Sequence, residues 1–403
     1  MRLAQRVAAL APSATLAITA RANELKKSGH DVINFGAGEP DFNTPDVIID
    51  AANAAMRAGA TKYTPSAGTL ELRKALSEKF RQENGLRYTP DSIVVTSGAK
   101  HALYLAFQAL LNPGDEVLIP TPYWTTYPEQ VKLADGIPVF VPGDPKRNGK
   151  IDARQLRQAI TTHSRVLVLN SPNNPTGAVY NTKELSDIVD VALDADLMIF
   201  SDEIYEHFLY EDFPTSCSVA ALSSAAFNHT LTINGASKTY AMTGWRIGYA
   251  AGPKPLIDAM VNLQSQSTSN PTSFAQAATI TALREAQEAI RGMYDAFVQR
   301  RSFCLEAIAR IPGINCIPPA GAFYVWMDIS GWLGKRSETR LLENADDAAA
   351  ALLDEAQVAV VPGTSFGSNH HLRISYATSL EELQRGFQRI SAFAYSLQDG
   401  PME

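Results

Sequence analysis

Short runs of apolar residues alternate along the middle of the chain with longer segments that have the periodicity of amphipathic helices. The apolar runs predict buried strands at residues 92–96, 116–119, 166–169, 197–200 and 231–234. Helical patterns follow two of these runs. One pattern ends at residue 111, and the other spans residues 183–193. Strands that alternate with helices predict an α/β fold with a mostly parallel sheet covered by helices.

The two ends of the chain carry further elements. Helices are expected at residues 14–26, 70–83 and 345–356, and a long helical region from residue 254 to about 311. Further strands are expected at residues 32–35, 247–251, 321–327 and 372–377. A chain of 403 residues is long for one hydrophobic core, so we expect about two domains.

Composition narrows the function classes. The chain is 45% hydrophobic and 19% charged, and its 35 basic and 42 acidic residues give a net charge of −7. A nucleic-acid partner would require a basic face, so we expect none. We see no signal peptide and no apolar run of membrane-spanning length, which favours a cytoplasmic protein without a membrane partner. The three cysteines lack metal-type spacing, so we expect reduced thiols and no metal.

Residues 235–248 carry the clearest chemical signal. They place Lys238 among small residues, and Arg246 follows beside a tryptophan and between two glycines. A lysine without charged neighbours suits a partly desolvated amine with a lowered pKa. Such an amine can form a Schiff base with a carbonyl group.

The whole segment resembles the pyridoxal-phosphate attachment site of the class I and II aminotransferases, and it is most similar to bacterial aspartate aminotransferases of subgroup Ib. The resemblance implies that Lys238 is the attachment lysine and the catalytic base, and that Ser237 and Arg246 bind the cofactor, pyridoxal 5′-phosphate. It further implies a fold-type I enzyme and a homodimer. Its large domain, residues 46–289, would hold a mostly parallel seven-stranded sheet, and its small domain would comprise residues 1–45 and 290–403.

Two of the predicted strands end in residues suited to hold this cofactor. Gly98, Ala99 and Lys100 stand between a strand and a helix, where free main-chain N–H groups can bind a phosphate. Asp202 lies at the carboxyl end of a strand, where open α/β sheets place their ligands. The resemblance implies that Asp202 pairs with the pyridine nitrogen and that Tyr205 binds the 3′-oxygen.

Loops supply the remaining cofactor contacts that the resemblance implies. Trp124 stands in a loop stiffened by prolines and would lie against the pyridine ring. Asn174 lies in a Ser-Pro-Asn-Asn-Pro-Thr-Gly run and would contact both the 3′-oxygen and the substrate carboxylate. Tyr63 would reach the phosphate of the neighbouring subunit.

Arg373 is expected inside a strand with apolar neighbours, where a buried arginine needs an anionic partner. The resemblance assigns it to the α-carboxylate of the substrate, with the amide of Gly38 as a second donor. An internal carboxylate such as Asp328 is the alternative partner. Ser13 and Lys100 would contact the distal carboxylate of aspartate, although Lys100 could also be simply solvated.

Several readings compete with an aspartate aminotransferase that uses 2-oxoglutarate as acceptor. An aminotransferase for alanine, methionine or aromatic amino acids would share the fold, and so would a β-lyase or a cyclopropane-forming synthase. A transcription regulator would need a basic module ahead of the fold, and only about 30 residues precede the strand near Gly38. Relatives that also act on prephenate carry a lysine where Ala11 stands, so we expect weak prephenate activity.

Overall fold

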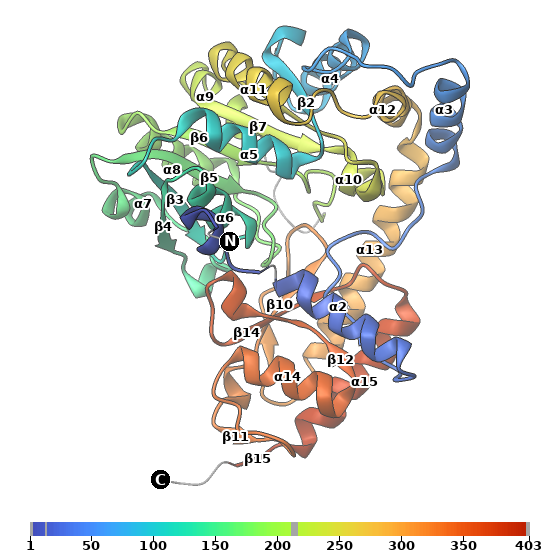
Figure 1. The fold of residues 1–403 in the computed structure, drawn as a ribbon. Helices are drawn as coiled ribbons and strands as arrows, with labels where there is room; N and C mark the ends of the chain where they lie inside the picture. Colours follow the sequence, from blue (N-terminus) through green and yellow to red (C-terminus); the bar gives the residue numbers. More distant parts are fainter. Residues whose placement is uncertain (1–2, 13, 211–216, 400–403) are drawn as a thin grey trace.

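The structure is a computed structural model that describes residues 3–12, 14–210 and 217–399. Its largest sheet has seven strands in the order β2-β8-β7-β6-β5-β3-β4 (Figure 1). Among these strands β8 alone runs opposite to the other six. The strands are β2 (Ile93–Thr96), β3 (Glu116–Thr121), β4 (Ile137–Pro142), β5 (Ser164–Asn170), β6 (Met198–Asp202), β7 (Thr230–Gly235) and β8 (Gly248–Ala251).

Apolar side chains on both faces of this sheet explain why its strands read as continuous hydrophobic runs. One face of the sheet packs against α5, α6 and α11. The other face packs against two groups of helices. The first group is α7, α8 and α9, and the second is α3, α4 and α12. These helices are α3 (Asp46–Arg57), α4 (Leu70–Glu83), α5 (Ala99–Leu110), α6 (Thr126–Leu133), α7 (Ala153–Ala159), α8 (Thr182–Asp194), α9 (Ser224–His229), α11 (Lys254–Ser267) and α12 (Ser273–Glu285).

A second sheet lies below the first in Figure 1 and is antiparallel throughout, with the order β13-β14-β10-β9. A single apolar core joins it to the helices α13, α14 and α15. The elements are β9 (Asn315–Cys316), β10 (Tyr324–Asp328), β13 (Val361–Pro362), β14 (His371–Ser375), α13 (Gln287–Ile308), α14 (Ala345–Ala356) and α15 (Leu380–Ser396).

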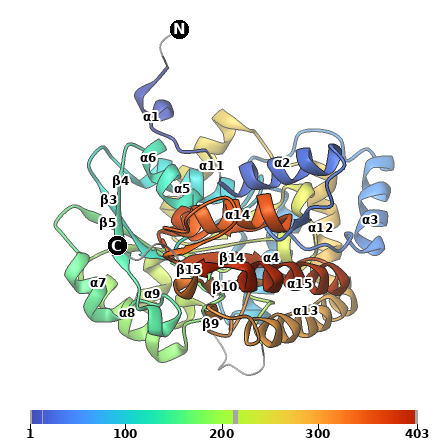
Figure 2. The same cartoon turned by 90° about the horizontal axis from the view of Figure 1, so that it is seen from below.

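The amino-terminal segment joins this second part of the molecule. Strand β1 (Ile33–Asn34) pairs in parallel with β12 (Val358–Ala359), more than 300 residues later in the chain. Helix α2 (Ala14–Lys27) therefore lies beside α14, as the view from below shows (Figure 2). The division of the chain at residues 46 and 289 agrees with this arrangement but stays a prediction.

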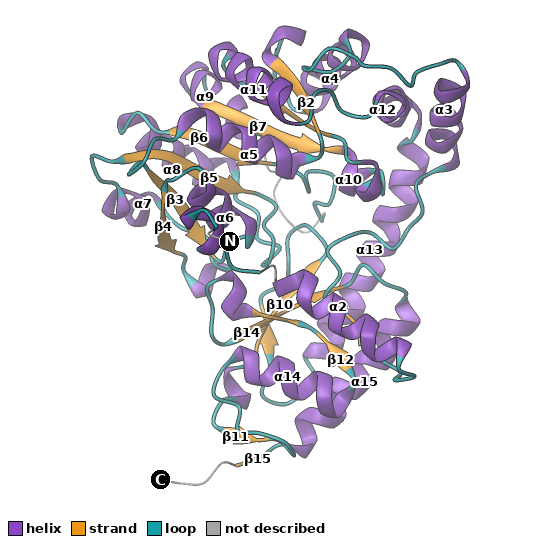
Figure 3. Cartoon of the chain, viewed as in Figure 1, coloured by secondary structure: helices purple, strands orange, loops and turns teal. Residues whose placement is uncertain are grey.

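Few elements remain outside these layers (Figure 3). Helix α1 (Gln5–Ala8) precedes α2, helix α10 (Ala236–Thr239) follows β7, and strand β11 (Lys335–Arg336) pairs with β15 (Gln398–Asp399). Within the described residues, six short 3-10 helices connect other elements, at Pro90–Ser92, Pro145–Arg147, Val219–Ala221, Thr243–Trp245, Ser330–Trp332 and Gly363–Phe366. No helix in the described ranges is long and apolar enough to cross a membrane.

Most predicted elements are present, with two informative differences. The helical region expected from residue 254 to 311 is divided into α11, α12 and α13, because Pro271 follows the first and Ala286 ends the second. Strand β4 was not predicted. It is an edge strand with two prolines and with Ile137 and Phe140 about half exposed, so it lacks the continuous apolar run of a central strand.

Candidate active site

A cavity of about 390 Å³ lies between the carboxyl edge of the seven-stranded sheet and the four-stranded sheet. It brings together residues that are far apart in the sequence and that come from both sheets. Among the predicted site residues, those that line it are Gly38, Ala99, Lys100, Trp124, Asn174, Asp202, Tyr205, Ser237, Lys238, Arg246 and Arg373. The structure therefore places most of the predicted residues around one space.

Lys238 stands on α10, the short helix that directly follows β7. Its ammonium group donates a hydrogen bond to the carbonyl oxygen of Gly38, from the opposite side of the cavity. Burial lowers the pKa of Lys238 to about 8, although the nearby carboxylate of Glu39 opposes this shift; the positive charges of Arg373 and Arg246 lower the pKa further. An amine in this state is partly neutral near physiological pH, as a nucleophile or a base requires.

An anion-binding corner forms where the amino terminus of α5 meets Arg246. The first N–H groups of a helix have no partner within the helix, and those of Ala99 and Lys100 belong to residues that line the cavity. Gly98 precedes them with φ +88°, and a Cβ there would lie 2.4 Å from Nη2 of Arg246. The Nη1 of Arg246 donates to the carbonyl oxygen of Thr243 at 2.8 Å, which holds the guanidinium in place.

Asp202 ends β6 and is almost fully buried, with 3% of its surface exposed. Its Oδ2 accepts a hydrogen bond from the hydroxyl of Tyr127 at 2.6 Å, and its Oδ1 accepts one from the main-chain N–H of Ile204 at 3.3 Å. Burial raises the pKa of Asp202 to about 6, whereas these hydrogen bonds and the charge of Lys238 oppose the rise. Glu203 points away from the cavity, as expected, and accepts from Ser201 and Ser218.

Tyr205, in the turn after β6, meets Tyr324 of β10 at the cavity. The hydroxyl groups of Tyr205 and Tyr324 share a hydrogen bond of 2.8 Å. Burial raises the pKa of both phenols, so both stay protonated at neutral pH. Tyr324 was not predicted as a site residue, and its position inside an apolar strand hid its polar role.

Arg373 is the most deeply buried cation of the site, with 1% of its surface exposed. Its Nη1 donates to the side-chain oxygen of Asn174 at 3.0 Å, and its Nη2 donates to the carbonyl oxygen of Gly36 at 2.8 Å. Its Nε has no hydrogen-bond partner within the described chain. The alternative of an internal partner, Asp328, is wrong: that carboxylate accepts from Ser330 instead.

Lys100 and Trp124 contact each other in the lining of the cavity. The Nζ of Lys100 lies 5.0 Å from the centre of the indole ring. Burial and the charge of Arg246 lower the pKa of Lys100. Lys100 makes no ion pair with any residue of the described part of the chain, so its charge is available to a ligand.

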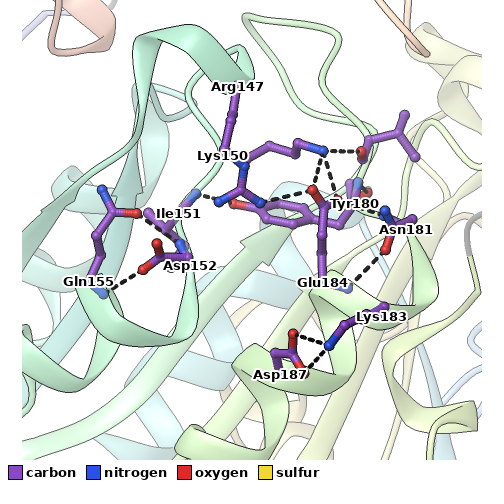
Figure 4. Close-up of polar contacts among 12 residues, drawn as sticks. Arg147, Lys150, Ile151, Asp152, Gln155, Tyr180, Asn181, Lys183, Glu184 and Asp187 are labelled. Atoms are coloured by element: carbon purple, nitrogen blue, oxygen red, sulfur yellow. Dashed lines mark hydrogen bonds and ion pairs between the residues drawn. The ribbon is translucent and has the colours of Figure 1, made fainter.

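A polar cluster holds the loop before α7 against α8 (Figure 4). Glu184 accepts hydrogen bonds from Arg147 at 2.8 Å and from Lys150 at 2.7 Å. Between these two basic residues, the side chain of Asn148 donates to the carbonyl oxygen of Thr176 at 2.9 Å. The cluster thereby anchors the turn that carries Asn174.

A second polar cluster lies outside the cavity. The ligand-type atoms of Glu83, Glu206 and His207 all fall within 4.8 Å of one another. The buried ammonium group of Lys79 already pairs with both carboxylates. This group therefore has an internal cation in place, and nothing in it requires a metal ion.

Two predicted site residues, Gly98 and Tyr63, do not line the cavity. Gly98 does not line the cavity but supports it from behind, in contact with Arg246. Tyr63 is 90% exposed and is not part of the cavity. Ser13 lies outside the described residues. Tyr127 also lines the cavity and was missed, although its place one helical turn after Trp124 was a usable signal.

Comparison with known proteins identifies the class. Residues 30–390 match the model of the family "aminotransferase class I and II". The chain belongs to this family, and it is an aminotransferase. It is 51% identical over 396 residues to an aspartate aminotransferase of Geobacillus stearothermophilus, which covers 98% of this chain and 99% of that protein.

Other relatives agree on fold and length. An aspartate/prephenate aminotransferase of Thermus thermophilus is 47% identical, covering 96% of this chain and 98% of the relative. The crystal structure of the aspartate aminotransferase from Rhizobium meliloti superposes with a TM-score of 0.95 at 44% identity, over 99% of this chain and 100% of that one. That of the Thermus thermophilus enzyme with maleate has a TM-score of 0.91 at 46% identity, over 98% and 100%.

Proposed function

We propose that this aminotransferase moves the amino group of L-aspartate to 2-oxoglutarate by a ping-pong mechanism that uses pyridoxal 5′-phosphate. The observation that carries the proposal is the pair of cations at the cavity, Arg373 and Lys100, neither of which has a carboxylate partner within the described chain. Two separate cations suit a substrate with two carboxylates.

The residues of the cavity fit the cofactor. The amino terminus of α5 and Arg246 would hold its phosphate. Because Gly98 has no Cβ, the guanidinium of Arg246 can lie directly beside the start of this helix. Asp202 would face the pyridine nitrogen, and Trp124 would lie against the ring. Tyr205 and Asn174 would bind the 3′-oxygen. Ser237 would add a further polar contact, and Lys238 provides the amine that attaches the cofactor.

When bound, the cofactor supplies an electron sink that stabilises negative charge at the substrate Cα. The chain supplies the groups around it. Asp202 would hold a negative charge close to the ring nitrogen and would so favour the protonated ring. Lys238, released from its attachment, accepts the Cα proton at Nζ, and its lowered pKa leaves a useful fraction of the amine unprotonated.

Substrate orientation follows from Arg373. Its planar fork can bind an α-carboxylate through two parallel N–H groups, and its partnerless Nε gives one of them. Asn174 and the main chain of Gly36 hold the guanidinium rigidly, so little side-chain entropy is lost on binding. The N–H of Gly38 would provide a further donor.

Lys100 would bind the distal carboxylate. It stands in the first turn of α5, where its charge adds to that of the helix terminus. The Thermus thermophilus structure with maleate is one of a relative bound to a four-carbon dicarboxylate. Ser13 is assigned to the same carboxylate. Because Ala11 stands where prephenate-using relatives carry a lysine, weak activity with prephenate is expected.

The proposal extends to a cytoplasmic homodimer. The large side chain of Tyr63 is 90% exposed and does not line the cavity of its own chain. Such a side chain suits a contact with the cavity of a partner subunit. A second copy would then bring this hydroxyl to the phosphate. The molecular mass in solution, measured by light scattering, tests this part directly, since a monomer with full activity would contradict it.

The test of the function is a single-turnover experiment. The purified protein, loaded with pyridoxal 5′-phosphate, is mixed in turn with L-aspartate, L-alanine and L-phenylalanine while the cofactor absorbance is followed. Fastest conversion to the aminated cofactor by aspartate is the expected result. Faster conversion by another amino acid would overturn the aspartate assignment, and no conversion with any of the three would favour a lyase of the same fold. Lys238→Ala should still bind cofactor but lose nearly all turnover.

A further inference from the structure

Tyr127 lines the cavity, and its side chain contacts two of the residues assigned to the cofactor, Trp124 and Asp202. Its ring meets the indole of Trp124 edge to face, with 5.4 Å between centroids and an interplanar angle of 85°. Its hydroxyl donates to Oδ2 of Asp202 at 2.6 Å. The side chain itself is only 2% exposed, so both contacts are made away from bulk water.

The position of Tyr127 follows from the local fold. Helix α6 begins immediately after the loop that carries Trp124, and the N–H of Tyr127 donates to the carbonyl oxygen of Trp124 at 3.1 Å. One helical turn therefore brings the two rings together. The hydroxyl then reaches the end of β6, which is separated from β3 by β5 in the sheet.

The hydrogen bond has an electrostatic consequence. Asp202 is buried, and burial alone favours its neutral form. A short bond from a neutral hydroxyl to a carboxylate stabilises the charged form. The other groups that face this carboxyl are the N–H of Ile204, the hydroxyl of Tyr205 and the charge of Lys238. When Lys238 is attached to the cofactor it gives up part of this support, so the hydroxyl of Tyr127 becomes the main remaining donor.

We propose that Tyr127 is a positioning residue that holds Asp202 in its ionised form and fixes its orientation relative to the indole of Trp124. The inference rests on the proposed use of pyridoxal 5′-phosphate for its functional meaning, because a protonated ring nitrogen needs a carboxylate. The contact itself is independent of the cofactor. Substrate need not touch Tyr127 for this role.

The experiment isolates the Asp202 carboxyl in the cofactor-free, full-length protein. Infrared difference spectra of wild type minus Asp202→Asn, recorded between about pH 4 and pH 9, give the carboxyl band of this one residue. The same difference is then measured in the Tyr127→Phe background, which keeps the ring and removes the hydroxyl. Tyr88→Phe is the matched control, because it removes another buried hydroxyl, bonded to Thr232 at 3.3 Å, at a residue that does not line the cavity.

We expect the midpoint of the Asp202 band to rise by about one unit in Tyr127→Phe, as the loss of a hydrogen bond to a charged group predicts. Tyr88→Phe should leave the midpoint unchanged. An equal midpoint in wild type and Tyr127→Phe, or an equal rise in Tyr88→Phe, would overturn the proposal.

A second measurement connects the contact to the cofactor. The dissociation constant of pyridoxal 5′-phosphate should rise about tenfold at pH 5 and about twofold at pH 7 in Tyr127→Phe, because the ionised fraction of Asp202 falls by these factors when its pKa rises by one unit from about 6. The difference should vanish above about pH 8, where Asp202 is ionised in both proteins. An unchanged dissociation constant at pH 5 would contradict the link to cofactor binding. If wild type failed to bind the cofactor at all while the infrared midpoint still moved, the proposed function would fall and the positioning role would stand.

Discussion

The Nη1 of Arg373 lies 3.0 Å from the side-chain oxygen of Asn174, and this hydrogen bond joins the four-stranded sheet to a loop of the seven-stranded sheet. The two residues are 199 positions apart in the chain. Their contact means that the group assigned to the substrate carboxylate and a group assigned to the cofactor are held as one unit. Movement of one part of the molecule against the other would therefore change both.

Replacement of Arg373 tests this unit. Arg373→Lys keeps the charge but loses the planar fork, so kcat/KM for every amino acid substrate should fall about 100-fold, mostly through KM. Arg301→Lys is the control, because Arg301 is also buried but does not line the cavity. Unchanged KM values in Arg373→Lys would remove Arg373 from substrate binding.

Lys100 should distinguish substrates by charge. Lys100→Ala should raise KM for aspartate by roughly 10- to 100-fold and KM for alanine less than threefold, because only aspartate has a second carboxylate. Lys132→Ala, a surface change on α6 where Lys132 pairs with Glu129, should affect neither. Equal increases for aspartate and alanine would show that Lys100 acts on the cofactor alone.

The pKa of Lys238 gives a pH dependence. Its folded value, about 8, is below the ordinary 10.5, so the reactive neutral amine increases as the pH rises through about 8. The rate at which the cofactor-free enzyme captures pyridoxal 5′-phosphate should follow the same curve. In Glu39→Gln the midpoint should move lower, because the Glu39 carboxylate raises this pKa. A midpoint near 10.5 in wild type would contradict the burial argument.

A matched pair of glycine substitutions tests the backbone packing behind the anion-binding corner. At Gly248 a Cβ would lie 2.1 Å from the main-chain nitrogen of Ala99, whereas at Gly244 nothing lies within 4 Å. Gly248→Ala should lower the free energy of unfolding by about 1–3 kcal/mol, because the first turn of α5 must shift. It should also weaken cofactor binding.

Gly244→Ala should leave both quantities nearly unchanged, since the added methyl group meets open space. Urea denaturation and a cofactor titration provide the two readouts. Equal stability of the two variants would contradict the predicted clash at Ala99.

The sequence predicted the strand-end residues well, because buried parallel strands have a strong apolar pattern and place their following residues at one edge. Asp202 and the turn around Gly98 were found in this way. Strand β4 was missed because an edge strand does not need that pattern, as half-exposed Ile137 and Phe140 show.

The rest of the site depends on contacts between distant segments. Tyr324 lies in an apolar strand, and nothing in its neighbourhood indicates that its hydroxyl meets Tyr205. The second role of Tyr127 requires knowledge of where β6 ends relative to α6. Tyr63 does not line the cavity of its own chain, so its role at the cavity of a second chain stays a prediction.

The pairing of β2 with β8 also constrains how the chain can be made. Strand β2 is an edge strand whose only partner in the sheet, β8, begins at Gly248. During synthesis about 150 further residues must therefore be made before β2 can pair with β8. An even longer stretch must be made before β1 can pair with β12. Because the anion-binding corner depends on the first pairing and the substrate arginine lies beyond the second, the catalytic cavity is completed only when almost the whole polypeptide has left the ribosome.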